Sequence, residues 1–527
     1  MMEPQVKGQT SSKPTFVEGE APALRLIAAL ILLVGATAYA ATQVGDLQNG
    51  AAITMAGLVG MYMALNIGAN DVANNVGAAV GSGALTMTGA LAIAVVFESA
   101  GAFLAGGDVI DTISKGIIDP NAIPDSDDFI WLMLSALLGA AVWVNIATCI
   151  GAPVSTTHSI VGSVLGAGLV AAGTGVVDWG VTGMIVASWV VSPVLGGAIA
   201  AAFLALIKAT IVYREDKVAA ARTWVPVFVA IMGAVFAAYL MMKGLKKVWR
   251  PDTTTILAIS GAAFATLYIM VRRMVAVAAA RMRNTREDVG RLFTVPLIGA
   301  AALLCFAHGS NDVANAIGPL AAIVHAASND WGVAATVSIP PWVMLVGALG
   351  LSAGLALYGA KLVTTVGKEI TEIDRLRAFP VVLSAAITVI VASALALPVS
   401  STHIALGAII GVGFLREYLQ HEAERVRIIR EFFNDKTKPK LFDSAKAEMA
   451  WRYSKLERAL KEPLSEQERG CYFELTQRAE TALKNCQRKK LVRRSLLYKI
   501  FAAWLVTVPA TAAISALLYL TIKGILL

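Results

Sequence analysis

The sequence predicts an all-α polytopic membrane protein with about 12 to 13 transmembrane helices, arranged as two inverted-topology repeats with helices broken at the midplane. Three observations predict this class. Of 527 residues, 57% are hydrophobic and 15% are charged, whereas about 25% are charged in a typical soluble domain. Apolar runs of the length that crosses a bilayer recur along the chain. Several motifs occur twice, in the same order and at nearly constant spacing.

The charge pattern favours a membrane protein over a nucleic-acid-binding one. The formal net charge is +8, but lysine and arginine cluster between apolar runs, as they do in cytoplasmic loops of membrane proteins. The four cysteines form no CxxC motif and no paired framework, so neither disulfides nor a zinc site is expected. No Walker sequence is present, so the sequence gives no support for ATP-driven transport.

Apolar runs of about 20 residues mark the expected spans. They lie near 24–43, 52–67, 83–107, 130–150, 155–173, 180–207, 224–242, 254–271, 293–324, 338–360, 378–397, 400–415 and 498–526. These runs divide the chain into a disordered cytoplasmic tail (1–22), an additional N-terminal helix (23–43), repeat 1 (50–210), linking helices and basic loops (211–292), repeat 2 (293–415 plus 496–527) and a charged cytoplasmic insertion (416–495).

The repeat is visible in short motifs. GANDVANN at 68–75 recurs as GSNDVANA at 309–316, which sets Asp71 against Asp312 with an offset of 312 − 71 = 241. PVSTTH at 153–158 recurs as PVSSTH at 398–403, with an offset of 398 − 153 = 245. Matched order and spacing indicate a duplication, interrupted in the second copy by the insertion.

The two repeats are expected to have opposite orientations in the membrane. Seven predicted spans, 52–67 through 254–271, separate equivalent points, and an odd number of crossings reverses orientation. The segment after the second span of repeat 1 is acidic, whereas its partner in repeat 2 is basic, so the positive-inside rule places the first outside and the second in the cytoplasm. The basic loop around Lys243 disagrees, because the same count places it outside.

The two Asn-Asp pairs, Asn70–Asp71 and Asn311–Asp312, are predicted to bind cations. A carboxylate inside an apolar run costs several kcal/mol unless a partner neutralises it. Gly68 and the asparagines are poor residues for a helix interior, so the backbone is expected to loosen and free carbonyl oxygens. Hard cations take oxygen ligands. A kinked helix capped by the aspartate is the alternative for a single copy, but the duplication favours a functional site.

The two hydroxyl clusters after proline are predicted to bind a tetrahedral oxyanion. Each follows a helix-starting signature, where free N–H groups and the positive end of the helix dipole favour an anion. An ordinary N-cap is the alternative for a single copy. The candidate anion-binding residues are Ser155, Thr156, Thr157, Ser400, Ser401 and Thr402.

The motifs resemble the signatures of the inorganic phosphate transporter (PiT) family. They are GANDVANNVGAAVGSGALT, VFESAGAFLAGGDVIDTISKGIID, PVSTTHSIVGSVLGAG, CFAHGSNDVANAIGPLAAI and PVSSTHIALGAIIGVG. The resemblance covers about 50–210 and 293–526 and implies a secondary active symporter that moves phosphate inward with a cation gradient by alternating access. It implies cation binding at the Asn-Asp pairs and phosphate binding at the hydroxyl clusters, and the GANDVAN form is more similar to the sodium-coupled type. A proton-coupled metal-phosphate or sulfate permease of the same family is the alternative.

Five further polar residues in apolar runs are possible supporting residues. Glu98 either binds a cation or proton or pairs with a nearby hydroxyl, and repeat 2 has Leu351 in its place. The remaining four are Asn74 and Asn315, which recur in the Asn-Asp motif, and His158 and His403, which close the hydroxyl clusters. His308 has Ile67 as its counterpart and is interpreted as a packing or supporting residue.

A membrane phosphate sensor that does not transport is the alternative from a different class. An enzyme is not expected, because no nucleophile and base occur with an orienting acid at a recognisable spacing, and no cofactor is expected. The expected partners are phosphate, Na⁺ or H⁺ and the lipid bilayer, and a homo-oligomer is possible. The chain is expected in the plasma membrane, for example a bacterial inner membrane, with its N-terminus and the 416–495 insertion cytoplasmic.

Overall fold

The computed structural model describes residues 22–44, 49–123, 125–150, 152, 154–245, 249–327, 339–369, 374–433 and 494–526. All regular elements in these ranges are helical. They are α1 (Pro22–Val44), α2 (Gly50–Gly81), α3 (Met87–Ala105), α4 (Gly107–Asp111), η1 (Thr112–Gly116), η2 (Pro120–Ala122), α5 (Ser126–Cys149), α6 (Thr156–Ala172), η3 (Thr174–Val176), α7 (Trp179–Ile207), η4 (Lys208–Val212), α8 (Lys217–Tyr239), η5 (Leu240–Gly244), α9 (Thr253–Ala279), α10 (Arg286–Arg291), α11 (Thr294–Asp312), α12 (Ala314–Ala327), α13 (Pro341–Glu369), α14 (Arg375–Ala394), α15 (Ser401–Phe433) and α19 (Arg494–Leu526).

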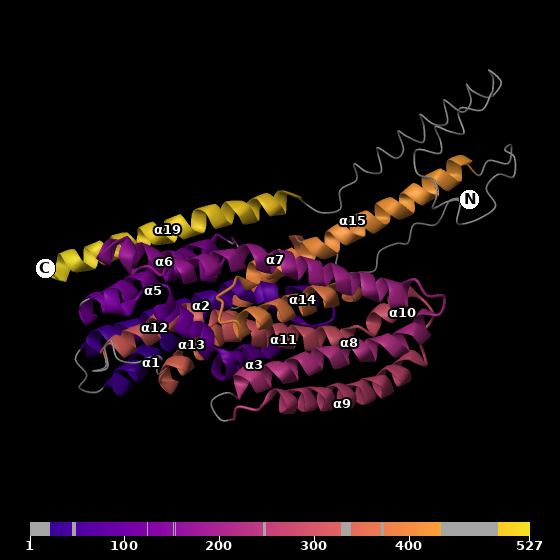
Figure 1. The fold of residues 1–527 in the computed structure, drawn as a ribbon, viewed down its shortest axis with the longest axis horizontal. Helices are drawn as coiled ribbons and strands as arrows, with labels where there is room; N and C mark the ends of the chain where they lie inside the picture. The colour runs from indigo at the N-terminus through magenta and orange to yellow at the C-terminus, as the bar shows by residue number, and fades with distance from the viewer. Residues whose placement is uncertain are drawn as a thin grey trace, which may run out of the picture.

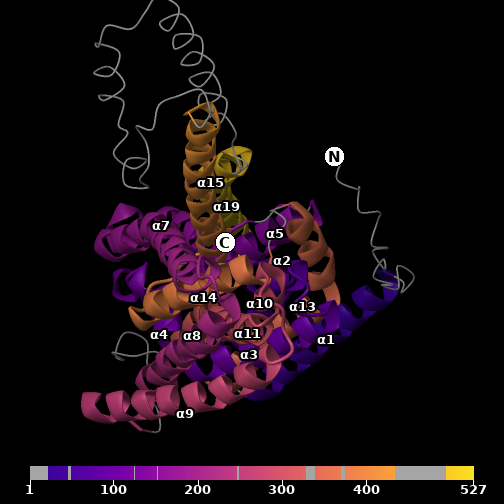
Figure 2. The same cartoon turned by 90° about the vertical axis from the view of Figure 1, so that its right-hand side faces the viewer.

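The helices form one elongated bundle, with α1 and α9 at its periphery (Figures 1 and 2). Eleven segments of the described chain are long and apolar enough to cross a membrane, and α6 is a shorter apolar helix. The all-α polytopic class predicted from the sequence is therefore confirmed. Residues 434–493 of the predicted insertion and residues 1–21 of the predicted tail lie outside the described residues.

Contacts at the two ends of α2 define the ends of the bundle. At its start, the Asn49 side chain donates to Asp127 at the start of α5 (2.6 Å). At its other end, the Arg375 guanidinium, at the start of α14, donates to the carbonyl of Gly83 (2.8 Å). We call the end of the bundle at the start of α2, where Asp127 lies, the acidic end. The opposite end, where Arg375 lies, is the basic end. Because α5 and α14 occupy equivalent places in the two repeats but start at opposite ends, the repeats are inverted.

The two hydroxyl motifs lie at the tips of helical hairpins. The α5–α6 hairpin starts at the acidic end and returns there, since Ile118 pairs with Val177 just after α6. The α14–α15 hairpin starts at the basic end, and α15 then extends beyond the bundle (Figure 1). The predicted spans 155–173 and 400–415 are thus return arms. Five crossings (α2, α3, α7, α8 and α9), rather than seven, separate the repeats, and five is also odd.

The loop that disagrees with the charge rule has a direct partner. Lys243 in η5 forms an ion pair with Asp108 in α4, within the acidic segment that follows the second span. This contact places Lys243 at the acidic end, on the side that the count of crossings gives. A lysine there compensates one of the acidic side chains.

The predicted loosening of the backbone at Gly68 and Asn70 is wrong, because α2 is continuous from Gly50 to Gly81. Gly68 serves close packing instead: a Cβ there would lie 2.0 Å from the Leu351 carbonyl oxygen of α13. Gly309 has the same role, since a Cβ there would lie 2.1 Å from the Glu98 carbonyl oxygen of α3. In repeat 2 the helical ladder breaks for one residue, Val313, between α11 and α12. The larger breaks are at the hairpin tips.

Candidate functional site

The Asn-Asp motifs and the hydroxyl clusters meet at the centre of the bundle. Asp71 is on α2 and Asp312 is the last residue of α11, and both are buried. Thr156 Oγ1 donates to Asp71 Oδ2 (3.1 Å), and the equivalent Ser401 Oγ donates to Asp312 Oδ2 (3.0 Å). Each carboxylate is therefore bonded to the hairpin tip of its own repeat.

The asparagines of the motif link one repeat to the other. Asn74 Nδ2 donates to Thr402 Oγ1 (2.8 Å), and Asn315 Nδ2 donates to Thr157 Oγ1 (3.1 Å). Thr402 Oγ1 in turn donates to Asp71 Oδ1 (3.0 Å). The two hairpins thus share one hydrogen-bonded network, in which Asn74 and Asn315 each join their own repeat to the hairpin tip of the other.

The first asparagine of each motif bonds to the helix that leads into its hairpin tip. Asn70 Nδ2 donates to Thr148 Oγ1 and Asn311 Nδ2 to Ser393 Oγ, both at 3.0 Å. Asn311 Oδ1 also accepts the backbone N–H of Val399 at 3.2 Å. These amides position the hairpin tips against the helices that carry the carboxylates.

Several buried side-chain oxygens of the site lack a hydrogen-bond partner in the described structure. They are Asn70 Oδ1, Asn75 Oδ1, Glu98 Oε2, Asp312 Oδ1 and Asn315 Oδ1. Buried polar atoms are nearly always paired, so such a group of acceptors needs an explanation. Carboxylate and amide oxygens are the ligands of hard cations, and this donor set fits one or more of them.

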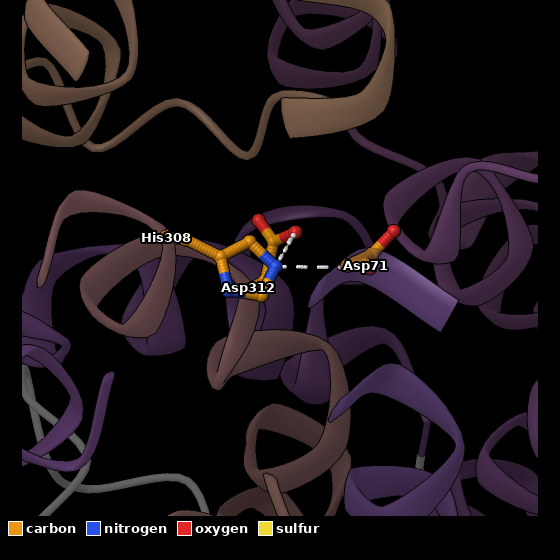
Figure 3. Close-up of side chains that lie close together, drawn as sticks. All are labelled: Asp71, His308 and Asp312. Carbon is orange, nitrogen blue, oxygen red and sulfur yellow. Dashed lines mark ion pairs between the residues drawn. The ribbon is translucent and has the colours of Figure 1, made fainter. Parts of the chain in front are cut away.

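One histidine joins the carboxylates of the two repeats (Figure 3). His308 Nε2 lies 3.0 Å from Asp312 Oδ2 and 3.7 Å from Asp71 Oδ2, while Nδ1 lies 3.3 Å from Glu98 Oε1. Glu98 Oε1 also accepts the Asn75 amide at 2.7 Å. One ligand atom each from Asp71, His308 and Asp312 lie within 4.8 Å of one another, a spacing that would suit a metal ion.

Sequence reasoning underestimates His308 and misses Asn75. The counterpart of His308 is Ile67, which suggests a packing role, yet the imidazole touches three carboxylates. The available signal is its position inside an apolar run one residue before the motif glycine. Glu98 pairs with an amide and an imidazole, not with the hydroxyl considered for it.

The first residue of each hydroxyl cluster caps a helix. Ser155 Oγ accepts the His158 N–H (3.1 Å) at the start of α6, and Ser400 Oγ accepts the His403 N–H (3.3 Å) at the start of α15. Ser155 Oγ also lies 2.5 Å from His158 Nδ1. The helix start predicted for both motifs is confirmed, and the phosphate role of these serines stays a prediction.

His158 and His403 face each other behind the hairpin tips. Their rings meet edge to face with centroids 4.9 Å apart, and the His158 ring also packs against Trp189 of α7, tilted by 32° with centroids 3.7 Å apart. Both imidazoles are buried. This arrangement packs the two hairpins against each other at the centre of the pseudo-symmetry.

A multi-pass helical bundle with two inverted repeats and a shared polar site at its centre defines a membrane transport protein. Residues 67–515 match the family model of the phosphate transporter family. The chain belongs to this family, as its motifs predict, and it is a permease rather than an enzyme.

Individual relatives agree with this assignment. A protein of Helicobacter pylori strain J99, provisionally named a phosphate permease, is 46% identical over 514 residues, which are 95% of each chain. One of Haemophilus influenzae with the same provisional name is 40% identical over 363 residues, 68% of this chain and 86% of the relative. A solved structure of a sodium-dependent phosphate transporter superposes with a TM-score of 0.73 at 32% identity, covering 90% of this chain and 100% of the other.

Proposed function

We propose that this phosphate transporter is a secondary active symporter that takes up inorganic phosphate with Na⁺ by alternating access. The observation that supports sodium most directly is the group of buried oxygens without partners around Asp71 and Asp312. The similarity to a sodium-dependent phosphate transporter points in the same direction. Asn70, Asp71, Asn311 and Asp312 are the proposed cation ligands.

Phosphate is proposed to lie at the hairpin tips. The starts of α6 and α15 offer backbone N–H groups, and Thr156, Thr157, Ser401 and Thr402 add hydroxyls. Three of these hydroxyls, on Thr156, Ser401 and Thr402, donate to the carboxylates. A cation that takes over a carboxylate releases its hydroxyl for phosphate, so each ion favours the binding of the other.

Alternating access is supported by the entry of the hairpins from opposite ends. Movement of the α5–α6 hairpin would open the site towards the acidic end, and movement of α14–α15 would open it towards the basic end. Inverted repeats with a site between them are typical of secondary transporters. By the positive-inside rule, the basic end, the N-terminus and the 416–495 insertion are cytoplasmic. The plasma membrane is the proposed location.

The electrical driving force constrains the stoichiometry. Monovalent phosphate entering with two Na⁺ carries one net positive charge, which gains about 2.3 kcal/mol per 100 mV of inside-negative potential. With one Na⁺ the step is electroneutral. An uncoupled anion would be driven outward, so a cation is required.

A proton-coupled metal-phosphate permease is the second candidate. The grouping of His308 with Asp71 and Asp312 favours it, because an imidazole beside two carboxylates also suits a divalent transition metal. Sodium prefers oxygen alone. In this case the metal ion would be cargo that travels with phosphate.

Uptake of radiolabelled phosphate into liposomes that contain the purified chain separates these functions. Sodium coupling predicts accumulation with an inward Na⁺ gradient and little with a proton gradient or none. The second candidate predicts accumulation with a proton gradient that depends on an added divalent metal. Equal uptake with no gradient would reject coupling, and phosphate binding without any uptake would indicate a sensor.

A further inference from the structure

Two guanidinium groups contact one carboxylate at the basic end, and two further cations lie within electrostatic range of it. Arg286 Nη2 lies 2.8 Å from Asp374 Oδ2, and Arg377 Nε lies 3.6 Å from the same oxygen. Lys208 and Arg416 also interact electrostatically with Asp374. We call these five residues the Asp374 cluster; its cations come from η4, α10, α14 and α15.

Asp374 leaves the cations of its cluster undercompensated. Its Oδ1 accepts the backbone N–H of Arg377 at 2.9 Å as the N-cap of α14. Lys208 is repelled by the guanidinium groups of Arg286, Arg377 and Arg416. Lys208, Arg377 and Arg416 are partly buried, where like charges are screened less than in water. Such an arrangement is stabilised by an additional anion.

A pocket of about 500 Å³ adjoins the cluster and shares Arg286 and Asp374 with it. Its lining residues are Ser82, Arg286, Glu287, Gly290, Arg291, Asp374, Arg375 and Leu376. Together, pocket and cluster hold six basic residues and two acidic ones, and Asp288, which pairs with Arg291, brings the formal balance to 6 − 3 = +3.

The Arg375 guanidinium is held in place in this pocket. It donates to the carbonyl of Gly83 (2.8 Å) and to Thr294 Oγ1 (3.0 Å). A guanidinium fixed in this way is preorganised, which lowers the entropy lost when it binds an anion. Ser82, which also lines the pocket, follows Asp71 on α2 by 82 − 71 = 11 residues, or about 16 Å along the axis. The pocket is therefore separate from the central site.

We propose that the Asp374 cluster and its pocket bind a phosphate group, either on an anionic phospholipid of the adjacent leaflet or as free inorganic phosphate. Guanidinium groups match phosphate oxygens with paired hydrogen bonds. Basic residues at the cytoplasmic surface attract the anionic lipids of that leaflet. A bound phosphate would connect η4 and α15 to α10 and α14. Binding at this site does not depend on sodium coupling.

Two measurements on the full chain in neutral detergent test the proposal: native mass spectrometry with lipids, and thermal unfolding with inorganic phosphate. Phosphatidylglycerol should remain bound at concentrations at which phosphatidylcholine does not. Alternatively, inorganic phosphate should raise the melting temperature of the Asp71→Asn variant, in which binding at the central site is weakened. Retention of lipid alone identifies the headgroup as the source, and stabilisation by phosphate alone identifies the free ion. Equal retention of both lipids together with no stabilisation by phosphate would overturn the proposal.

Matched double variants then locate the site. Lys208→Gln with Arg416→Gln should weaken the binding by about tenfold or more, because two of the cations that attract the phosphate are removed. Arg272→Gln with Arg273→Gln removes two exposed cations from α9 and should leave it unchanged. Each variant is first checked for an unchanged melting temperature without ligand, and Arg377→Gln replaces the first pair if that pair unfolds. An equal loss in the α9 control would show nonspecific attraction and reject the site.

Discussion

Replacement of Asp71 by asparagine keeps the size of the side chain and removes its charge. In the wild type, Thr156 Oγ1 donates to one oxygen of the Asp71 carboxylate (3.1 Å) and Thr402 Oγ1 donates to the other (3.0 Å). An amide has a single oxygen, so one of these hydroxyls faces an NH2 group and can no longer donate there. A cation at this position loses its charged ligand at the same time.

The size of the effect follows from the loss of one charged partner. A contact to a charged group contributes about 1.5–3 kcal/mol, and about 1.4 kcal/mol corresponds to a tenfold change in affinity. We therefore expect the sodium concentration for half-maximal phosphate uptake to rise about 10- to 150-fold.

The assay is phosphate uptake by liposomes over a series of external sodium concentrations at fixed phosphate. Asp127→Asn is the matched control, because it makes the same chemical change at an exposed residue of the acidic end. The control should keep the sodium dependence of the wild type. A wild-type sodium dependence in the Asp71→Asn variant would remove this carboxylate from the cation site.

Four further substitutions test the packing and polar contacts of the site. Gly309→Ala would place a Cβ 2.1 Å from the Glu98 carbonyl oxygen. It should lower the free energy of unfolding by about 1–3 kcal/mol, seen as a lower melting temperature. Gly77→Ala is the control and should leave the melting temperature unchanged, because no atom lies within 4 Å of the added Cβ. Glu98→Gln and His308→Gln should each reduce phosphate uptake. Because the two side chains interact at 3.3 Å, the double variant should lose less uptake activity than the sum of the two single losses. Additive losses would show that the two residues act independently. Ser155→Ala should destabilise the protein by about 0.5–2 kcal/mol, measured by thermal unfolding, because the cap of α6 is lost. A larger effect on phosphate affinity than on stability would instead identify Ser155 as a direct phosphate ligand.

Much of the fold is predictable because the membrane and the duplication constrain it strongly. Apolar runs locate the helices, and the spacing of the paired motifs sets Glu98 against Leu351. The helix packing agrees with that register: Gly309 packs on Glu98, and Gly68 packs on Leu351. Inversion is also predictable, since it depends only on an odd number of crossings.

The path of each helix is harder to predict, because composition does not separate a span from a hairpin arm. The segment 155–173 is as apolar as a span, but it is the second arm of a hairpin and leads from the hairpin tip back to the acidic end, where the first arm starts. Gly68 suggests a loosened backbone, whereas the neighbouring helix approaches there to a distance that only glycine permits. A glycine in a helix serves either purpose, and only the tertiary contact distinguishes them.

The candidate site is predictable where it repeats and unpredictable where it does not. Asp71 and Asp312 stand out as a duplicated pair, and they share one site in the structure. His308 and Asn75 occur in one repeat each, so duplication gives no signal for them. The role of His308 depends on contacts with Asp71 and Glu98 of the other repeat, and that of Asn75 on a contact with Glu98 of a neighbouring helix; sequence spacing reveals neither.

Equilibrium binding of phosphate to the purified chain, with and without sodium, tests the central claim most directly. If two inverted repeats hold cation and phosphate in one site, sodium must raise phosphate affinity, and phosphate must raise sodium affinity by the same factor. We expect this mutual effect in the wild type and its loss in Asp312→Asn. Phosphate affinity that is independent of sodium in the wild type would contradict a shared site.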